Sequence, residues 1–163
     1  MKKEDLHGFV PAVVTPFNEK GEIMEDAYQH LVNWLIGQGA SAICVSGDNG
    51  ESWALSAEEK GRLTKLAVDE AAGRVPVITG CSSTMLKSSV EFAFAAKENG
   101  ASAVLSMPQT YVLKTTRDEL LSRFEKLNAA IDMPIVAYNS PRRAGLNLSI
   151  DDIGAIMDVA PII

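Results

Sequence analysis

The chain has 163 residues, of which 47% are hydrophobic and 22% charged, and this composition and length are typical of one globular domain, residues 1–163. The formal net charge of −6 argues against nucleic acid or an anionic membrane as a partner, because both favour basic surfaces. No apolar run approaches the roughly 18 residues of a membrane span. Residues 1–5 also lead into no long apolar segment of the kind that a secretion signal contains.

Five short apolar segments predict the strands of a parallel sheet. They are rich in β-branched or small side chains and cover residues 9–15, 41–46, 75–80, 102–107 and 134–138. Continuous apolar runs are typical of strands that are covered on both faces, whereas a strand with one solvated face alternates apolar and polar residues. The last three residues, 161–163, predict the opening of a sixth strand.

Helices are predicted between these strands. The first has an apolar stripe at helical spacing, which ends before Gly39 and consists of Tyr28, Leu31, Val32, Leu35 and Ile36. Capping-box patterns at residues 56–59 and 116–119 begin the second and fourth helices. The third helix is predicted over residues 85–98, and a fifth over residues 150–158 with Ser149 as its cap.

The strand–helix unit recurs about every 30 residues, the size of one βαβ step. Such regular alternation predicts an α/β fold with a parallel sheet. Two architectures share this pattern: an open doubly wound sheet, and a (β/α)8 barrel, which needs about 250 residues. Length favours the open sheet. The polar residues favour the barrel, because all the predicted strand ends carry them and a barrel gathers its contacts from every strand onto one rim.

The first polar segment follows the second predicted strand and consists of Gly47, Asp48, Asn49, Gly50 and Glu51. Two glycines let the backbone come close to a ligand and direct its amides at an anion such as a carboxylate. The same residues are expected in a plain strand-to-helix turn, so both interpretations stay open. The sequence has no Gly-x-x-x-x-Gly-Lys pattern, which leaves a phosphate-binding P-loop unsupported.

The second polar segment, residues 138–145, follows the fifth predicted strand. Tyr138 can donate and accept a proton, and Arg143 can form two hydrogen bonds to a carboxylate. The alternative is a packed tyrosine followed by solvated arginines.

The two cysteines, Cys44 and Cys81, lie in apolar strand-like runs. No neighbouring Cys or His has the spacing of metal ligands, so they predict buried free thiols in a reducing cytoplasm rather than a disulfide or a metal site.

Four stretches, taken in order, resemble the dihydrodipicolinate synthase / N-acetylneuraminate lyase family, the Schiff-base aldolases and dehydratases that act on pyruvate and related 2-oxo acids. Residues 11–17 resemble its first strand, residues 47–51 its Gly-Thr-Thr-Gly-Glu loop, residues 108–111 its Pro-x-Tyr-Tyr segment, and residues 138–145 its Tyr-Asn-x-Pro-x-Arg-x-Gly motif. The resemblance implies a (β/α)8 TIM barrel, of which this chain would hold the N-terminal five βα units and the start of strand six.

The resemblance also implies roles for individual residues. Tyr138 matches the catalytic tyrosine that moves protons beside the substrate carboxylate, and Tyr111 is the best match for the tyrosine that joins this proton relay. The loop that grips the 2-oxo acid carboxylate is matched by Gly47, Asp48, Asn49 and Gly50. Arg143 matches the arginine that helps to fix a distal carboxylate in the synthase branch. No metal or organic cofactor is implied, and the longer protein is expected to be a homo-oligomer.

Two departures from the family pattern matter. Asp48 and Asn49 stand where the family has two threonines. A threonine hydroxyl donates and accepts hydrogen bonds, whereas an ionised aspartate only accepts and repels a nearby carboxylate. A sugar-acid aldolase or dehydratase therefore fits the loop as well as the synthase does. The family's nucleophilic lysine, whose amine forms an iminium with the keto group, would fall just beyond Ile163. Lys114 is the lysine nearest to the rim, but it lies in a polar loop, and the chain as written is expected to form no Schiff base.

Three functions are compatible with these residues. The first is a lyase or aldolase that acts on pyruvate or a related 2-oxo acid through a lysine Schiff base, with the lysine beyond the end of this chain. The second is a truncated, non-catalytic half-barrel that binds a 2-oxo acid or a partner chain, and whose exposed sheet edges favour aggregation or pairing. The third is an unrelated doubly wound binding domain, which would be a stable monomer.

Overall fold

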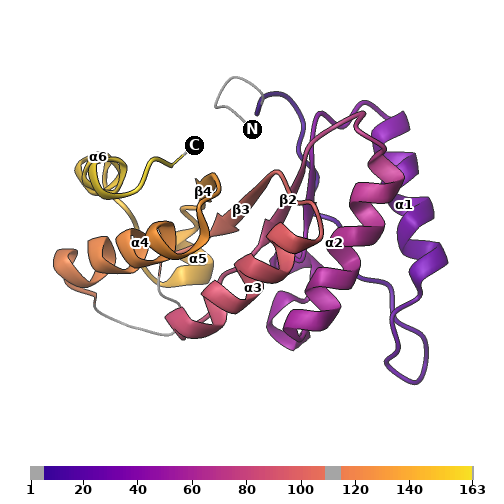
Figure 1. The fold of residues 1–163 in the computed structure, drawn as a ribbon, viewed down its shortest axis with the longest axis horizontal. Helices are drawn as coiled ribbons and strands as arrows, with labels where there is room; N and C mark the ends of the chain where they lie inside the picture. The colour runs from indigo at the N-terminus through magenta and orange to yellow at the C-terminus, as the bar shows by residue number, and fades with distance from the viewer. Residues whose placement is uncertain (1–5, 109–114, 163) are drawn as a thin grey trace.

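A computed structural model describes residues 6–108 and 115–162, arranged as a parallel sheet with helices along it (Figure 1). The sheet has the order β1-β2-β3-β4, and its strands are β1 (Ile43–Val45), β2 (Val77–Gly80), β3 (Ala103–Ser106) and β4 (Ile135–Ala137). All three strand pairs are parallel. The four strands confirm the second to fifth predicted strands in shorter form.

Both edges of the sheet are extended by isolated bridges. At one edge Ala12 pairs in parallel with Cys44, and the Val13 amide donates to the Cys44 carbonyl at 2.9 Å. At the other edge Ile162 pairs in parallel with Ile135. The first predicted strand, residues 9–15, is therefore an extended segment beside β1 rather than a regular strand. Pro11 explains the difference, because it has no amide hydrogen with which to continue the ladder.

The five predicted helices are confirmed. They are α1 (Glu25–Gly37), α2 (Ala57–Ala71), α3 (Leu86–Glu98), α4 (Arg117–Ile131) and α6 (Ile150–Val159). The capping boxes form at Ser56 and Thr116, and a third at Ser149 begins α6. Three shorter elements, which the sequence predicts only as polar loops, follow β1 and β4: the 3-10 turns η2 (Asp48–Gly50) and η3 (Ser52–Ala54), and α5 (Pro141–Ala144).

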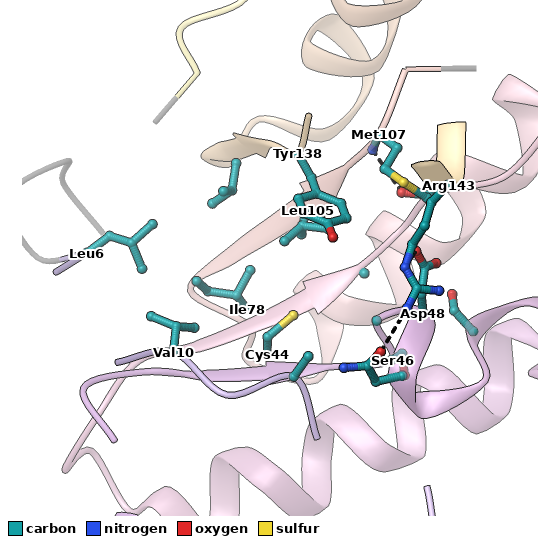
Figure 2. A pocket seen from close by; sticks show the side chains of 17 residues that line it. Leu6, Val10, Cys44, Ser46, Asp48, Ile78, Leu105, Met107, Tyr138 and Arg143 are labelled. Carbon is teal, nitrogen blue, oxygen red and sulfur yellow. Dashed lines mark hydrogen bonds and ion pairs between the residues drawn. The ribbon is translucent and has the colours of Figure 1, made fainter. Parts of the chain in front are cut away.

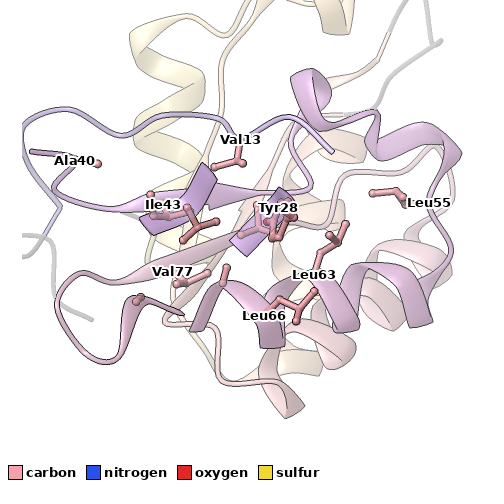
Figure 3. Packing of buried hydrophobic residues seen from close by; sticks show 12 residues of the cluster. Val13, Tyr28, Ala40, Ile43, Leu55, Leu63, Leu66 and Val77 are labelled. Atoms are coloured by element: carbon pink, nitrogen blue, oxygen red, sulfur yellow. The ribbon is translucent and has the colours of Figure 1, made fainter. Parts of the chain in front are cut away.

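One face of the sheet packs against helices. In the cluster of Figure 3, Ile43 and Val77 of the strands pack with Tyr28, Leu63 and Leu66 of α1 and α2. A second cluster joins β3 and β4 to α4 and α6 through Val104, Ile135, Phe124, Leu127 and Ile156. These side chains are all buried, and removing their apolar surface from water stabilises the domain.

The other face of the sheet is covered differently. Its buried residues are Ala42, Ile78 and Ala103, which pack with Leu105, Val136 and the N-terminal Leu6 and Val10. Within residues 6–108 and 115–162, this cluster includes no helix residue. Successive strand residues alternate between the two faces, as Val77 and Ile78 do, and both faces are apolar. This arrangement explains why each strand is a continuous apolar run.

Both cysteines are free and buried, as predicted. Among the described residues, no helix combines the length and apolar character that crossing a membrane requires. The same residues contain no group of three or more Asp, Glu, His or Cys side chains that could hold a metal ion.

Candidate active site

A cavity of about 360 Å³ opens at the carboxyl ends of the strands, on the sheet face that carries Ile78 and Val136 (Figure 2). Its floor is apolar and includes Val10, Cys44, Ile78, Leu105 and Val136. Its rim is polar and includes Ser46, Gly47, Asp48, Asn49, Ser82, Tyr138 and Arg143. An apolar hollow with a few convergent polar groups is the usual form of a small-molecule site. The structure thus brings five of the predicted site residues, Gly47, Asp48, Asn49, Tyr138 and Arg143, to one cavity.

The loop after β1 is tightly bent. Ser46 and Glu51 at its two ends have φ angles of 50° and 57°, in the left-handed region that non-glycine residues rarely adopt. Between them, Thr15 Oγ1 donates to the Gly50 carbonyl at 2.8 Å. A Cβ at Gly50 would lie 2.7 Å from the Val13 carbonyl oxygen, so this close approach requires glycine. Backbone strain of this kind is concentrated at functional sites.

Gly50 itself is buried and does not line the cavity, so its predicted contact with a substrate stays a prediction. Tyr111, the predicted second tyrosine of the proton relay, lies outside the described residues. Sequence reasoning missed Ser46, which is 1% exposed and lines the cavity. Its hydroxyl has no hydrogen-bond partner within the described ranges, although buried polar groups normally have one. Its position at the carboxyl end of a buried strand is the signal that could have revealed it.

Arg143 reaches across the rim to the loop after β1. Its Nε lies 3.4 Å from Asp48 Oδ2, and its Nη2 donates to Asn49 Oδ1 at 3.1 Å. Arg143 belongs to α5, which begins at Pro141, a residue whose fixed φ suits the first helical position. The Asn139 side chain holds the segment after β4 in place by accepting from the Leu148 amide at 3.2 Å. The sequence predicts both ends of this ion pair as site residues but not that they meet.

Tyr138 directly follows β4, and its amide donates to the Ser106 carbonyl at 2.9 Å. Its side chain points into the cavity (Figure 2), and the residue is 37% exposed. A tyrosine hydroxyl in this position can donate a proton to a bound molecule and accept one from it.

Lys60 of α2 is a further charged group near the loop. The residue is fully buried, its Nζ donates to Ser52 Oγ at 2.5 Å, and this nitrogen lies 4.6 Å from the centroid of the Phe92 ring. Burial lowers the pKa of Lys60 to about 8, against the opposing influence of Cys81 and Asp48. Sequence reasoning missed it. The signal was its helical spacing from Thr64 and Ala67, which places Lys60 on the buried face of α2.

Burial of Lys60 makes stability depend on pH. Between pH 8 and its ordinary pKa of 10.5, the unfolded lysine keeps a proton that the folded one has released, so the free energy of unfolding should rise with pH. The stabilisation gained from releasing the proton is complete above pH 10.5 and is lost as the pH falls through about 8, a change of about 3 kcal/mol.

Urea unfolding of the wild type and of Lys60→Met at several pH values from 7 to 10.5 measures this effect. Burial also raises the pKa values of Cys44 and Cys81, to about 11 and 12, but both thiols are present in both proteins. The free energy of unfolding of the wild type minus that of Lys60→Met should therefore increase as the pH rises. A difference that stays constant with pH would contradict the prediction.

Comparison with known proteins identifies the family of this chain. Residues 5–163 match the model of the dihydrodipicolinate synthetase family. The 4-hydroxy-tetrahydrodipicolinate synthases of Maridesulfovibrio salexigens and Nitrobacter hamburgensis are 39% and 36% identical over 156 and 157 residues. Each alignment covers 96% of this chain, but only 53% and 52% of the relative. The chain thus spans about half the length of the curated relatives it matches.

Solved structures give the same result. The dihydrodipicolinate synthase from Acinetobacter baumannii, crystallised with pyruvate, matches with a TM-score of 0.89 and 31% identity over 96% of this chain and 53% of that chain. N-acetylneuraminate lyase from Mycoplasma synoviae matches with a TM-score of 0.85 and 28% identity over 99% of this chain and 54% of that one. The family model and these relatives together show that the chain belongs to the dihydrodipicolinate synthetase family.

Proposed function

We propose that the protein is a lyase or aldolase that acts on pyruvate or a related 2-oxo acid through a lysine Schiff base. In this proposal the chain supplies the first five βα units and the start of strand six of a (β/α)8 barrel, and the lysine follows beyond Ile163. Support comes from the consecutive strand order, from the bridges of Ala12 and Ile162 at the two edges, and from relatives about twice as long.

The observation that carries the proposal is the composition of the cavity. A 2-oxo acid has a carboxylate, a keto group and a short apolar chain. The apolar floor suits the chain, and Tyr138 can exchange a proton with the keto oxygen. The Ser46 hydroxyl, which has no hydrogen-bond partner among the described residues, and the backbone of the loop 47–49 offer donors for the carboxylate. The A. baumannii synthase of similar fold was crystallised with pyruvate, which is a molecule of this class.

The proposed chemistry assigns a role to each group. The lysine amine forms a C–N bond to the keto carbon, and the keto oxygen leaves as water after receiving protons, for which Tyr138 is the donor. The resulting iminium withdraws electrons, so that a proton can leave the adjacent carbon and an enamine forms. Tyr111 would help Tyr138 in moving protons, and the loop after β1 would hold the carboxylate throughout.

Reductive trapping tests this proposal. The purified protein is incubated with pyruvate and sodium borohydride, with a control that omits the borohydride, and its intact mass is measured. We expect a reduced adduct on a species heavier than 17.5 kDa. A species of 17.5 kDa without an adduct would overturn the catalytic proposal and leave a non-catalytic half-barrel. An adduct on a 17.5 kDa species would contradict the assignment of the lysine to a position beyond Ile163.

A further inference from the structure

The ion pair of Asp48 and Arg143 lies where two cavities meet. Both residues line the cavity of about 360 Å³, and both also line a second cavity of about 380 Å³. Other residues around the second cavity carry hydroxyl groups or apolar side chains, among them Ser83, Thr84, Phe92 and Trp53. A molecule that extends from the first cavity toward the second therefore passes this ion pair.

The edge of Arg143 that could hold a carboxylate is already engaged. Nε and Nη2 are the adjacent donors that form paired hydrogen bonds to a carboxylate. Here Nε faces Asp48 Oδ2 at 3.4 Å, and Nη2 donates to Asn49 Oδ1 at 3.1 Å. Asp48 Oδ2 is buried and makes no hydrogen bond within the described part of the chain. Its close partner is thus the Arg143 guanidinium, whose positive charge it offsets.

Asp48 offsets the positive charge of Arg143, and Lys60 does not offer a ligand another positive charge to contact. The lysine is fully buried, it donates to Ser52, and it lines neither cavity. A ligand in either cavity can therefore reach Asp48 and Arg143, but it does not reach Lys60. A ligand carboxylate at this point would lie beside the Asp48 carboxylate, where like charges repel. A ligand hydroxyl could instead donate to Asp48 and accept from Arg143.

We propose that Asp48 determines specificity, and that the second substrate is an aldehyde with hydroxyl groups, rather than a carboxylate, at the end that faces Arg143. The inference rests on the proposed function, because it concerns the second substrate of the same site. In the reaction, the enamine carbon forms a C–C bond to the aldehyde carbon, and the aldehyde oxygen takes up a proton. Water then cleaves the C–N bond to release the product and regenerate the lysine amine.

Two aldehydes that differ in the group at the far end test this specificity. Glyceraldehyde is neutral and hydroxylated, and succinic semialdehyde carries a carboxylate at its far end. The measurement is kcat/KM for the addition of pyruvate to each aldehyde. We expect the wild type to prefer glyceraldehyde, and we expect Asp48→Asn and Asp48→Thr to shift the ratio toward succinic semialdehyde at least tenfold. Glu58→Gln, which makes the same change of charge at an exposed residue that lines neither cavity, should leave the ratio unchanged.

Borohydride trapping with pyruvate, applied to every variant, separates the two ways in which the inference can fail. If the wild type forms no pyruvate adduct, the proposed function is wrong and the inference falls with it. If the adduct forms but the wild type prefers succinic semialdehyde, Asp48 does not exclude a carboxylate. An unchanged ratio in both Asp48 variants would likewise overturn the inference. The wild-type preference is measured without any substitution, so it decides the question even if a variant does not fold.

Discussion

Replacing Tyr138 with phenylalanine is expected to lower kcat of the proposed reaction by about 10²–10⁴-fold, the loss typical of removing a positioned proton donor. The substitution removes only the hydroxyl that points into the cavity. Phenylalanine keeps the aromatic ring and the backbone hydrogen bond to Ser106, so the fold and the KM for pyruvate should change little. Steady-state kinetics with pyruvate and an aldehyde measures both constants.

Tyr28→Phe is the matched control for this prediction. The Tyr28 hydroxyl is buried without a hydrogen-bond partner among the described residues, and it lies in the core between α1 and the sheet, away from the cavity. Its removal should leave kcat unchanged and should not lower stability, because no hydrogen bond is lost. If both variants lose activity equally, or if Tyr138→Phe keeps full activity, then Tyr138 is not the proton donor.

Replacing Gly80 with alanine should destabilise the protein by about 2–3 kcal/mol, the upper part of the usual range for overpacking. A Cβ at Gly80 would lie only 2.2 Å from the Ser46 carbonyl oxygen and 3.0 Å from its carbonyl carbon. Backbone atoms cannot rotate away as a side chain can, so the strand end or the loop must move. Because Ser46 begins the loop that forms the cavity rim, pyruvate binding should weaken as well.

Gly154→Ala serves as the control for the glycine substitution. Gly154 lies within α6, and an added Cβ there would meet nothing within 4 Å. This variant should be stabilised by up to about 1 kcal/mol, because alanine favours helix more than glycine does. Urea unfolding measures both effects, and calorimetric titration measures pyruvate affinity. Equal stability of the wild type and Gly80→Ala would show that the loop can move away from β2 without cost.

The regular elements could be predicted from the sequence because their signals are local. The capping boxes at Ser56 and Thr116 fix where α2 and α4 begin, and the apolar runs around Ile43 and Ile78 are typical of strands buried on both faces. The first predicted strand was the partial exception. Its apolar pattern is correct, but Pro11 interrupts the hydrogen-bond ladder beside β1.

Five of the predicted site residues line the cavity, but the sequence predicted neither Ser46 beside them nor the contacts between them. Asp48 and Arg143 each follow a strand end, which is a local property of the sequence. Their ion pair depends instead on where α5 lies relative to the loop after β1. Lys60 was missed for a different reason. Lysine is almost never fully buried, so its position on α2 is not by itself enough to predict that Lys60 lies in the interior.

The contact between Arg143 and Asn49 joins positions 94 residues apart, and this separation has a consequence for folding. Helices such as α2 and α3 can form from neighbouring residues, whereas the rim exists only when β1 and β4 are held in one sheet by the strands between them. Contacts between residues so far apart in the sequence form slowly, because the chain loses much conformational entropy before the stabilising contact is made. During synthesis, the polypeptide would therefore acquire most of its helices before it acquired any affinity for a ligand.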